Sequence, residues 1–241
     1  MEVHELAGRA RPVSLARDHL VAALPQLAGL LPDGGLRRGS TVVVHPGVGL
    51  GAGATSLTLA LMVAASQAGS WCAAVGLPEL GLVAAAGLGV CLERFALIPA
   101  PGDQWPIVTA ALLDAVDLVL VSPPWRPRMA DARRLSARAR ERGAVLLALS
   151  GSWPEGADLR LSVTAATWRG LGQGQGHLRA REVEVTASGR RAATRERRIR
   201  LWLPGAGGTL EAVEDAFTAE DSDRVAPSPA PELAPLVPKA G

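Results

Sequence analysis

The residues with the clearest chemical potential form a glycine loop after a short run of branched residues. A glycine stands at every second position from 47 to 53, directly behind the run from Thr41 to His45. The loop comprises Gly47, Gly49, Gly51, Gly53, Ala54, Thr55 and Ser56. A glycine loop between a strand and a helix lets successive backbone N–H groups converge on a phosphate, and the helix dipole adds to the attraction. The pattern therefore indicates phosphate-binding topology.

The loop lacks the charged residue that this chemistry needs. A complete motif also places a Lys on the β- and γ-phosphates and a Ser or Thr on Mg²⁺. Ala54 stands at the Lys position, five rather than four residues separate Gly47 from Gly53, and the only Lys of the chain is Lys239. We favour a Gly-rich turn in which Thr55 and Ser56 cap the following helix. The other interpretation is weak binding of phosphate or sulfate.

The elements around the loop alternate between strand and helix. Continuous branched apolar runs predict buried strands at 41–45, 71–75, 95–99, 117–121 and 144–149. Helical patterns lie between them at 54–68, 78–89, 103–115 and 127–142. This alternation predicts an α/β fold, with a mainly parallel central sheet and helices on both of its faces.

Beyond residue 150 the pattern predicts antiparallel strands at 159–165, 177–186 and 195–203, which end in a C-terminal hairpin. This region is basic, and its arginines are candidate contacts to nucleic-acid phosphates. They are Arg179, Arg181, Arg190, Arg191, Arg195, Arg197 and Arg198. A solvated strand face explains the same charges equally well. The loop with Gln173, Gln175 and His177 is similarly open to a DNA contact or to simple flexibility.

The two ends of the chain differ from the core. Leucines near helical spacing predict a helix over 13–31 that ends or bends at Pro25. Residues 206–241 are acidic and Pro-rich, which predicts a disordered tail. We therefore divide the chain into a helical segment at 1–31, a core at 32–205 and a tail at 206–241.

Composition excludes several classes. The net charge of the 241 residues is only +2, and Cys72 and Cys91 lie in apolar contexts typical of reduced thiols. The four His are scattered, so no metal site is expected. No signal pattern or purely apolar run of about 18 residues occurs, which predicts a cytoplasmic protein without a membrane span.

Six Trp are the main aromatic residues. Trp71 and Trp105 fall within regular elements and are predicted to be core. The others lie at strand ends or in loops, where an aromatic residue can anchor an interface, although core packing is the commoner fate. They are Trp125, Trp153, Trp168 and Trp202. The candidate partner contacts are Leu15, Leu20, Leu24, Trp125 and Trp168.

The ordered set of motifs resembles the RecA recombinase core over residues 30–203. Its parts are Asp-Gly-Gly-Leu-Arg-Arg-Gly-Ser at 33–40, the loop and helix that follow, Leu-Gly-Val at 88–90 and Val-Asp-Leu-Val-Leu-Val-Ser at 116–122. The Trp-to-Leu segment at 168–178 and Leu-Trp-Leu-Pro-Gly at 201–205 are similar to the actinobacterial ImuA group. The resemblance implies a RecA-like P-loop fold.

Three functional positions of the RecA family are replaced. Ala54 stands for the Lys, Ser122 stands for the acidic residue that ends the strand before it, and the water-activating carboxylate matches a position near Pro78. Glu79, one residue along, could serve only if the loop shifted. Phosphoryl transfer depends on all of these parts, so we expect no ATPase activity and no cofactor.

The resemblance implies a non-catalytic adaptor in the damage-induced SOS response. Its expected partners are an inactive Y-family polymerase homologue and an error-prone C-family polymerase, which together perform mutagenic translesion synthesis. One alternative is a recombinase-like protein that binds ATP, Mg²⁺ and DNA, with an Arg in place of the missing Lys. Another is a DNA-binding module that needs no nucleotide, with single-stranded DNA as its partner.

Overall fold

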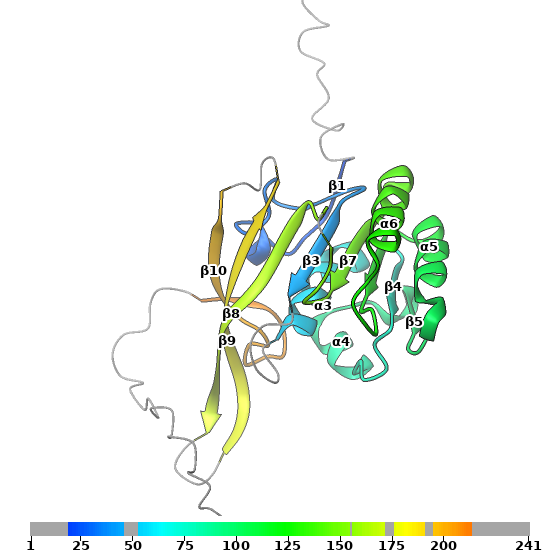
Figure 1. Cartoon of the computed structure of the whole chain (residues 1–241). Helices are drawn as coiled ribbons and strands as arrows, with labels where there is room; N and C mark the ends of the chain where they lie inside the picture. The colour runs from blue at the N-terminus through cyan, green and yellow to red at the C-terminus, as the bar shows by residue number, and fades with distance from the viewer. Residues whose placement is uncertain (1–18, 46–52, 155, 172–175, 191–194, 214–241) are drawn as a thin grey trace, which may run out of the picture.

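A nine-stranded sheet forms the centre of the molecule. The computed structural model describes residues 19–45, 53–154, 156–171, 176–190 and 195–213. The strand order is β11-β10-β9-β8-β3-β7-β6-β4-β5, and Figure 1 shows helices on the half of the sheet that contains β3 to β7. This sheet and the helices that cover it confirm the predicted α/β class and the mainly parallel centre.

The parallel half holds the strands predicted from branched runs. Its strands are β3 (Thr41–His45), β4 (Cys72–Val75), β5 (Phe95–Ile98), β6 (Leu118–Val121) and β7 (Val145–Leu149). The helices between them are α3 (Ala54–Gln67), α4 (Leu82–Leu88), α5 (Trp105–Ala115) and α6 (Met129–Arg142). The 3-10 turns η2 (Leu92–Arg94) and η3 (Gly102–Gln104) precede β5 and α5. Because these strands run parallel, their amino ends share one edge of the sheet and their carboxyl ends the other.

The C-terminal half extends the same sheet with antiparallel strands. They are β8 (Leu159–Leu171), β9 (Gly176–Gly189), β10 (Arg197–Trp202) and β11 (Glu211–Ala212). β8 pairs in parallel with β3 through Val42 to His45, then antiparallel with β9. The far part of β8 and β9 continues beyond the other strands as a two-stranded arm (Figure 1).

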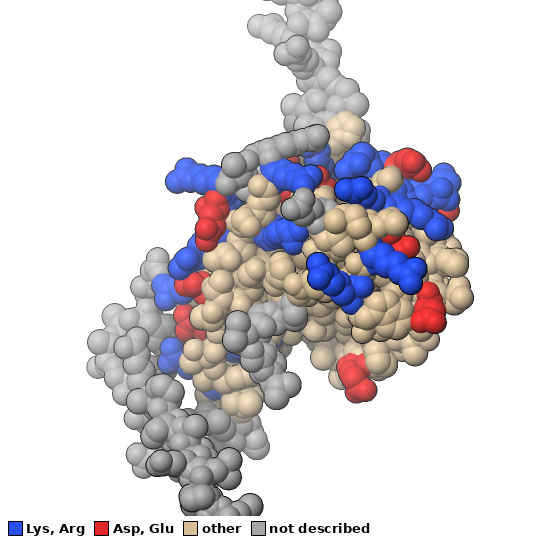
Figure 2. All heavy atoms as spheres, in the orientation of Figure 1, with Lys and Arg blue, Asp and Glu red and all other residues tan. Residues whose placement is uncertain are grey.

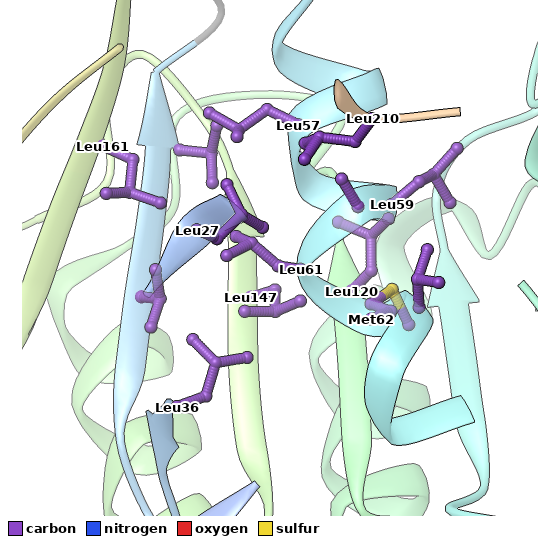
Figure 3. Close-up of a cluster of buried hydrophobic side chains, with 14 of the residues drawn as sticks. Leu27, Leu36, Leu57, Leu59, Leu61, Met62, Leu120, Leu147, Leu161 and Leu210 are labelled. Carbon is purple, nitrogen blue, oxygen red and sulfur yellow. The ribbon is translucent and has the colours of Figure 1, made fainter. Parts of the chain in front are cut away.

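Alternation along the buried strands divides the core into two layers. Val42 and Val44 face a cluster with α3, α4 and Leu27, whereas Val43 faces a cluster with α5 and α6. Figure 3 shows the first cluster, in which Leu57, Leu61 and Met62 of α3 pack over Leu120 and Leu147. α3 is buried on nearly all sides, which explains why this helix contains no charged residue.

The predicted helix at 13–31 is wrong for its described part. Residues 19–31 form the short strand β1 (Leu20–Val21) and the 3-10 turn η1 (Pro25–Leu27). β1 pairs antiparallel with β2 (Leu36–Arg37). Pro25 has no N–H for a helical hydrogen bond, and Leu27, Leu30 and Leu31 are buried in the 3-10 turn and the turns that follow it. Residues 1–18 lie outside the described part.

The core also continues past its predicted end at residue 205. Leu210 is buried, and Glu211 and Ala212 pair with β10. The Gly-rich composition of 205–208 indicates a tight turn here rather than the start of a tail, since Gly208 N–H donates to the carbonyl of Gly205. The predicted tail from 214 onward lies outside the described residues.

The exposure of a tryptophan cannot be predicted from whether it falls within a regular element. Trp105 is core, as predicted, but Trp71 is 49% exposed, so that prediction is wrong. Trp71 lies one residue before β4, where the chain is still at the sheet edge. Trp153 is buried and Trp125 is 50% exposed.

Both cysteines are free thiols, and burial raises the pKa of Cys72 to about 12. Within the described ranges, no helix is long and apolar enough to cross a bilayer.

Candidate functional site at the amino end of α3

Helix α3 begins at the last residues of the glycine loop. Gly53 precedes the helix with a left-handed φ of 97°, and its carbonyl accepts the N–H of Leu57 at 2.8 Å. Neither Gly53 nor its neighbours cap the helix with a side-chain hydrogen bond; the Thr58 hydroxyl instead donates to the carbonyl of Ala54. The predicted capping by Thr55 and Ser56 is therefore wrong. Gly47, Gly49 and Gly51 lie outside the described residues.

A guanidinium from the antiparallel region reaches the amino end of α3. Arg181 of β9 donates from Nη2 to the Ser56 hydroxyl at 3.1 Å, and from Nε to the carbonyl of Leu203 at 2.7 Å. Backbone hydrogen bonds hold Arg181 in place, because its N–H donates to Pro204 and its carbonyl accepts the N–H of Leu203. One side chain thus connects β9, the segment after β10 and the first turn of α3.

The surroundings of Arg181 are those of an internal group. The residue is only 4% exposed, and its Cζ lies 4.9 Å from the centroid of the Trp168 ring, its partner across the β8–β9 pair. Burial lowers the pKa of the Arg181 guanidinium. The positive end of a helix dipole attracts anions, so a phosphate-binding helix offers this position to its ligand. Here the chain's own cation lies beside Ser56 at that end.

Gly53 is fitted to the guanidinium beside it. A Cβ at residue 53 would lie 2.8 Å from Nη2 and 2.9 Å from Cζ of Arg181. Such distances are shorter than any normal carbon contact, and the left-handed φ independently favours glycine. The last glycine of the loop therefore has a structural role that does not require a phosphate.

The residues around this end of α3 do not match what a nucleotide needs. Ala54 has no donor, and Ser122, half-buried after β6, offers a hydroxyl where a Mg²⁺-bound carboxylate would be needed. Glu79 is exposed in the turn before α4. Among the described residues, no group of three or more His, Cys, Asp or Glu is placed to hold a metal ion. The described part of the site thus fits ATP poorly.

The structure disperses the arginines predicted to contact nucleic acid. Arg181 is buried, so it does not lie on the surface where a nucleic-acid phosphate would meet it. Arg198 pairs with Glu184 at 3.3 Å, and the neighbouring Arg200 pairs with Glu182 at 3.6 Å. Arg179, Arg190 and Arg195 are exposed, Arg197 is half-buried and Arg191 lies outside the described residues. The hairpin face is therefore a mixture of paired and exposed charge.

The candidate partner residues also differ in their surroundings. Leu24 packs against the main core, and Leu20 is half-buried in β1. Trp125, after β6, and Trp168, on the β8–β9 arm, are 50% and 41% exposed. Leu15 lies outside the described residues, as do Gln173 and Gln175 of the loop predicted to be open to a DNA contact. A role in partner contact stays a prediction for Leu15, Leu20, Leu24, Trp125 and Trp168.

The alternation of side chains along β9 already indicates in the sequence that Arg181 points inward. Side chains two residues apart on a strand share a face, and Val183, Val185 and Ala187 are buried on the face that Arg181 shares. Its partner Ser56 lies 125 residues away along the chain. The alternation signals an inward arginine, but only the fold shows that this arginine meets α3.

Comparison with known proteins assigns the parallel half to a family. Residues 29–155 match the MT3502 N-terminal domain. A relative in Mycobacterium tuberculosis, the uncharacterized protein Rv3395c, is 38% identical over 151 residues, which cover 62% of this chain and 74% of the relative. Arg181 and the antiparallel strands lie beyond the family match.

A solved structure supports the fold. The KaiC-like protein PH0186 from Pyrococcus horikoshii superposes with a TM-score of 0.55 over 81% of this chain and 99% of its own, at 14% identity. At that identity the likeness concerns the fold alone, and the mainly parallel sheet with its covering helices is RecA-like. By the match over more than half of its length, the chain belongs to the MT3502 N-terminal domain family.

Proposed function

We propose that this protein is a non-catalytic RecA-like adaptor of the ImuA group that supports error-prone translesion synthesis. Its expected partners are an inactive Y-family polymerase homologue and an error-prone C-family polymerase. The adaptor would join them in the SOS response to DNA damage through protein contacts, without turning over ATP.

The observation that carries the proposal is the position of Arg181. A nucleotide-hydrolysing protein keeps the amino end of its loop helix available for phosphate, and it places a Lys and a metal-binding acid around that phosphate. In this chain the buried Arg181 guanidinium bonds to Ser56 at that helix end, Ala54 replaces the Lys and Ser122 replaces the acid. A scaffold that keeps the fold but fills this position is suited to assembly rather than to phosphoryl transfer.

The two motifs that resemble the ImuA group lie on strands β8 to β10 and in the turn that follows β10. The 168–178 segment begins on the β8–β9 arm, and Leu201 to Gly205 form the end of β10 and the turn that Arg181 contacts. Trp168 of the first motif and Leu203 and Pro204 of the second thus contact the internal arginine.

Co-purification with the polymerase homologue tests the proposal. The full chain should retain the homologue at physiological salt, and a chain that ends at Val213 tests the acidic tail without removing the buried Leu210 or β11. Trp125→Ala tests an exposed aromatic anchor; loss of an interface hot spot typically weakens binding by about tenfold or more. If the full chain fails to retain either polymerase, the adaptor function is wrong. If the truncated chain retains the homologue as well as the full chain does, the tail has no part in the contact.

The same arginine also supports a second candidate, a recombinase-like protein that binds ATP and DNA. An Arg at the amino end of α3 could contact a phosphate if its bond to Ser56 were exchanged for one to the ligand. This candidate predicts that Mg²⁺-ATP raises the melting temperature and that Arg181→Ala abolishes the rise. The adaptor predicts no rise that requires Mg²⁺ in either chain.

A further inference from the structure

A basic pocket lies at the opposite edge of the sheet from the amino end of α3. It is formed by the β2–β3 turn, the last turn of α6, the start of β8 and the end of β9. We call it the amino-edge pocket; its charged residues are Asp33, Arg37, Arg38, Arg140, Asp158 and Arg190. Its volume is about 280 Å³, near the lower limit for small-molecule sites.

Most of the positive charge around this pocket is uncompensated. Arg38 pairs with Asp117 at 3.0 Å, and the Asp158 carboxylate accepts the backbone N–H of Thr41 at 2.9 Å. Within the part of the chain that the structure describes, no carboxylate lies at ion-pair distance from Arg37, Arg140 or Arg190. Three exposed arginines without a carboxylate partner therefore line one cavity. Each can bind a phosphate with two parallel hydrogen bonds.

The backbone that carries these arginines is fixed by the sheet. Gly39 N–H donates to the carbonyl of Ala144, and Arg190 N–H donates to the carbonyl of Asp158, both at 3.1 Å. Gly39 has a left-handed φ of 77°, and a Cβ there would lie 3.1 Å from the Cα of Arg140. The glycine thus allows the β2–β3 turn to approach α6. The arginines are held together by the fold even though they are far apart in sequence.

The pocket offers a ligand charge and hydrogen-bonding groups rather than an apolar wall. Leu36, Val42 and Leu159 line it but are only 1 to 5% exposed, so they give a base little surface. Asp33 is exposed at the same cavity and can accept a hydrogen bond from the amino group of a base.

The pocket continues into a wider basic surface. Figure 2 shows Arg side chains over α6 and near the start of β3. α6 contributes Arg133, Arg134, Arg138, Arg140 and Arg142, of which Arg138 and Arg142 are paired with Asp114. A strand that places one nucleotide in the pocket would find further cations for its neighbouring phosphates.

We propose that the amino-edge pocket binds a nucleotide unit of single-stranded nucleic acid, with its phosphate on Arg37, Arg140 and Arg190. The site goes beyond the adaptor function, because it gives the protein its own contact to the template strand. It also lies away from the paired hairpin face and from the filled end of α3.

Fluorescence anisotropy with a labelled single-stranded oligonucleotide of about 20 residues tests the site. The variant combines Arg37→Gln, Arg140→Gln and Arg190→Gln. Its matched control combines Arg126→Gln, Arg128→Gln and Arg179→Gln, which removes three exposed charges that lie outside α6 and outside the pocket. The pocket variant should bind at least about tenfold more weakly, and its salt slope should fall by about 0.7, the contribution of the one single-strand phosphate that the three arginines hold. The control should change affinity by less than about threefold.

Equal losses in the two variants would overturn the proposal, as would an unchanged pocket variant. Should the triple variant fail to fold, Arg37→Gln alone, on the exposed turn, should still weaken binding about threefold. Competition assigns the ligand: an unlabelled strand should displace the probe, whereas displacement by a glutamate-rich peptide at equal charge would contradict a nucleic-acid site. Displacement by a free mononucleotide at micromolar concentration would support the nucleotide pocket and identify the free form as its ligand.

Discussion

The two edges of the central sheet contrast in how they treat charge. At the carboxyl edge, where the glycine loop leads into α3, a single cation is buried at 4% exposure and bonded to Ser56 and Leu203. At the amino edge, several cations surround an open cavity without carboxylate partners among the described residues. At the edge with the recognisable motif the chain's own cation lies beside Ser56, whereas at the other edge three arginines line a cavity. The glycine loop before α3 therefore indicates which proteins this chain is related to more reliably than it indicates what the chain binds.

The largest expected effect comes from removing the cation at the carboxyl edge. Arg181→Ala leaves the Leu203 carbonyl and the Ser56 hydroxyl without their donor and opens a void beside Trp168. Loss of a buried, hydrogen-bonded charge typically costs about 3 kcal/mol of unfolding free energy. Urea unfolding followed by circular dichroism measures this loss.

The exposed Arg179→Ala, two residues away on the same strand, is the control and should change stability by less than about 0.5 kcal/mol. Arg181→Lys should fall between the two, because an ammonium keeps the charge but loses the fork geometry. An Arg181→Ala protein as stable as the parent would contradict the structural role.

Gly53→Ala tests whether the chain packs tightly against the Arg181 guanidinium at the amino end of α3. The new Cβ would meet the Arg181 guanidinium at 2.8 Å and adopt a φ of 97°, so we expect a cost of about 2 to 3 kcal/mol. Gly34→Ala is a matched control, since its φ is 72° but nothing lies within 4 Å of its Cβ. That control should cost only about 1 kcal/mol. Equal melting temperatures for the two variants would show that a Cβ at residue 53 does not clash with the Arg181 guanidinium.

Trp168→Leu tests the aromatic cover of the buried cation. The ring lies 4.9 Å from Arg181 Cζ, and a cation–π contact of this kind contributes about 1 kcal/mol. Trp125→Leu replaces a similarly exposed ring and should leave stability within about 0.5 kcal/mol. Thermal melting distinguishes the two; a larger loss for Trp125 than for Trp168 would contradict the assigned contact.

The smallest effect is the pH dependence of the exposed ion pair between α5 and α6. Hydrogen bonds from Arg138, with help from Arg142, lower the pKa of Asp114. A carboxyl with a lowered folded pKa stabilises the protein above its unfolded pKa of about 3.9, and this contribution is lost as pH falls through the folded pKa.

Asp114→Asn should therefore reduce the melting temperature slightly at pH 7, and the difference from the parent should shrink as the pH falls below the unfolded pKa of about 3.9 and through the folded pKa. Asp103→Asn, on an exposed turn before α5, is the control and should show no such convergence. A difference that grows toward low pH would have the wrong sign for this account.

The sequence predicted the regular elements well where local pattern decides. Thr41 to His45 forms a strand with the predicted bounds, and the β6 and β7 strands follow from their branched runs. Local pattern failed at residues 19–31, where buried leucines suit a helix but Pro25 and pairing with β2 produce a strand and a 3-10 turn. It failed again at Trp71, whose exposure depends on how the sheet edge meets solvent.

The two sites were harder to predict because their residues meet only in three dimensions. Parity on β9 signals that Arg181 faces inward, but nothing local places it against Ser56, 125 residues earlier. The amino-edge pocket joins Arg37, Arg140 and Arg190, which come from three elements distant in sequence. Only the order of strands in the sheet brings these elements to one edge.

The central claim is that the amino end of α3 is closed to nucleotide, and thermal melting of the full chain with millimolar Mg²⁺-ATP tests it most directly. The account predicts no shift that requires Mg²⁺. A shift that persists in the variant with Arg37, Arg140 and Arg190 changed to Gln, and that Arg181→Ala abolishes, would contradict it. At 100 times its dissociation constant, ATP would add about 2.7 kcal/mol and raise the midpoint by several degrees.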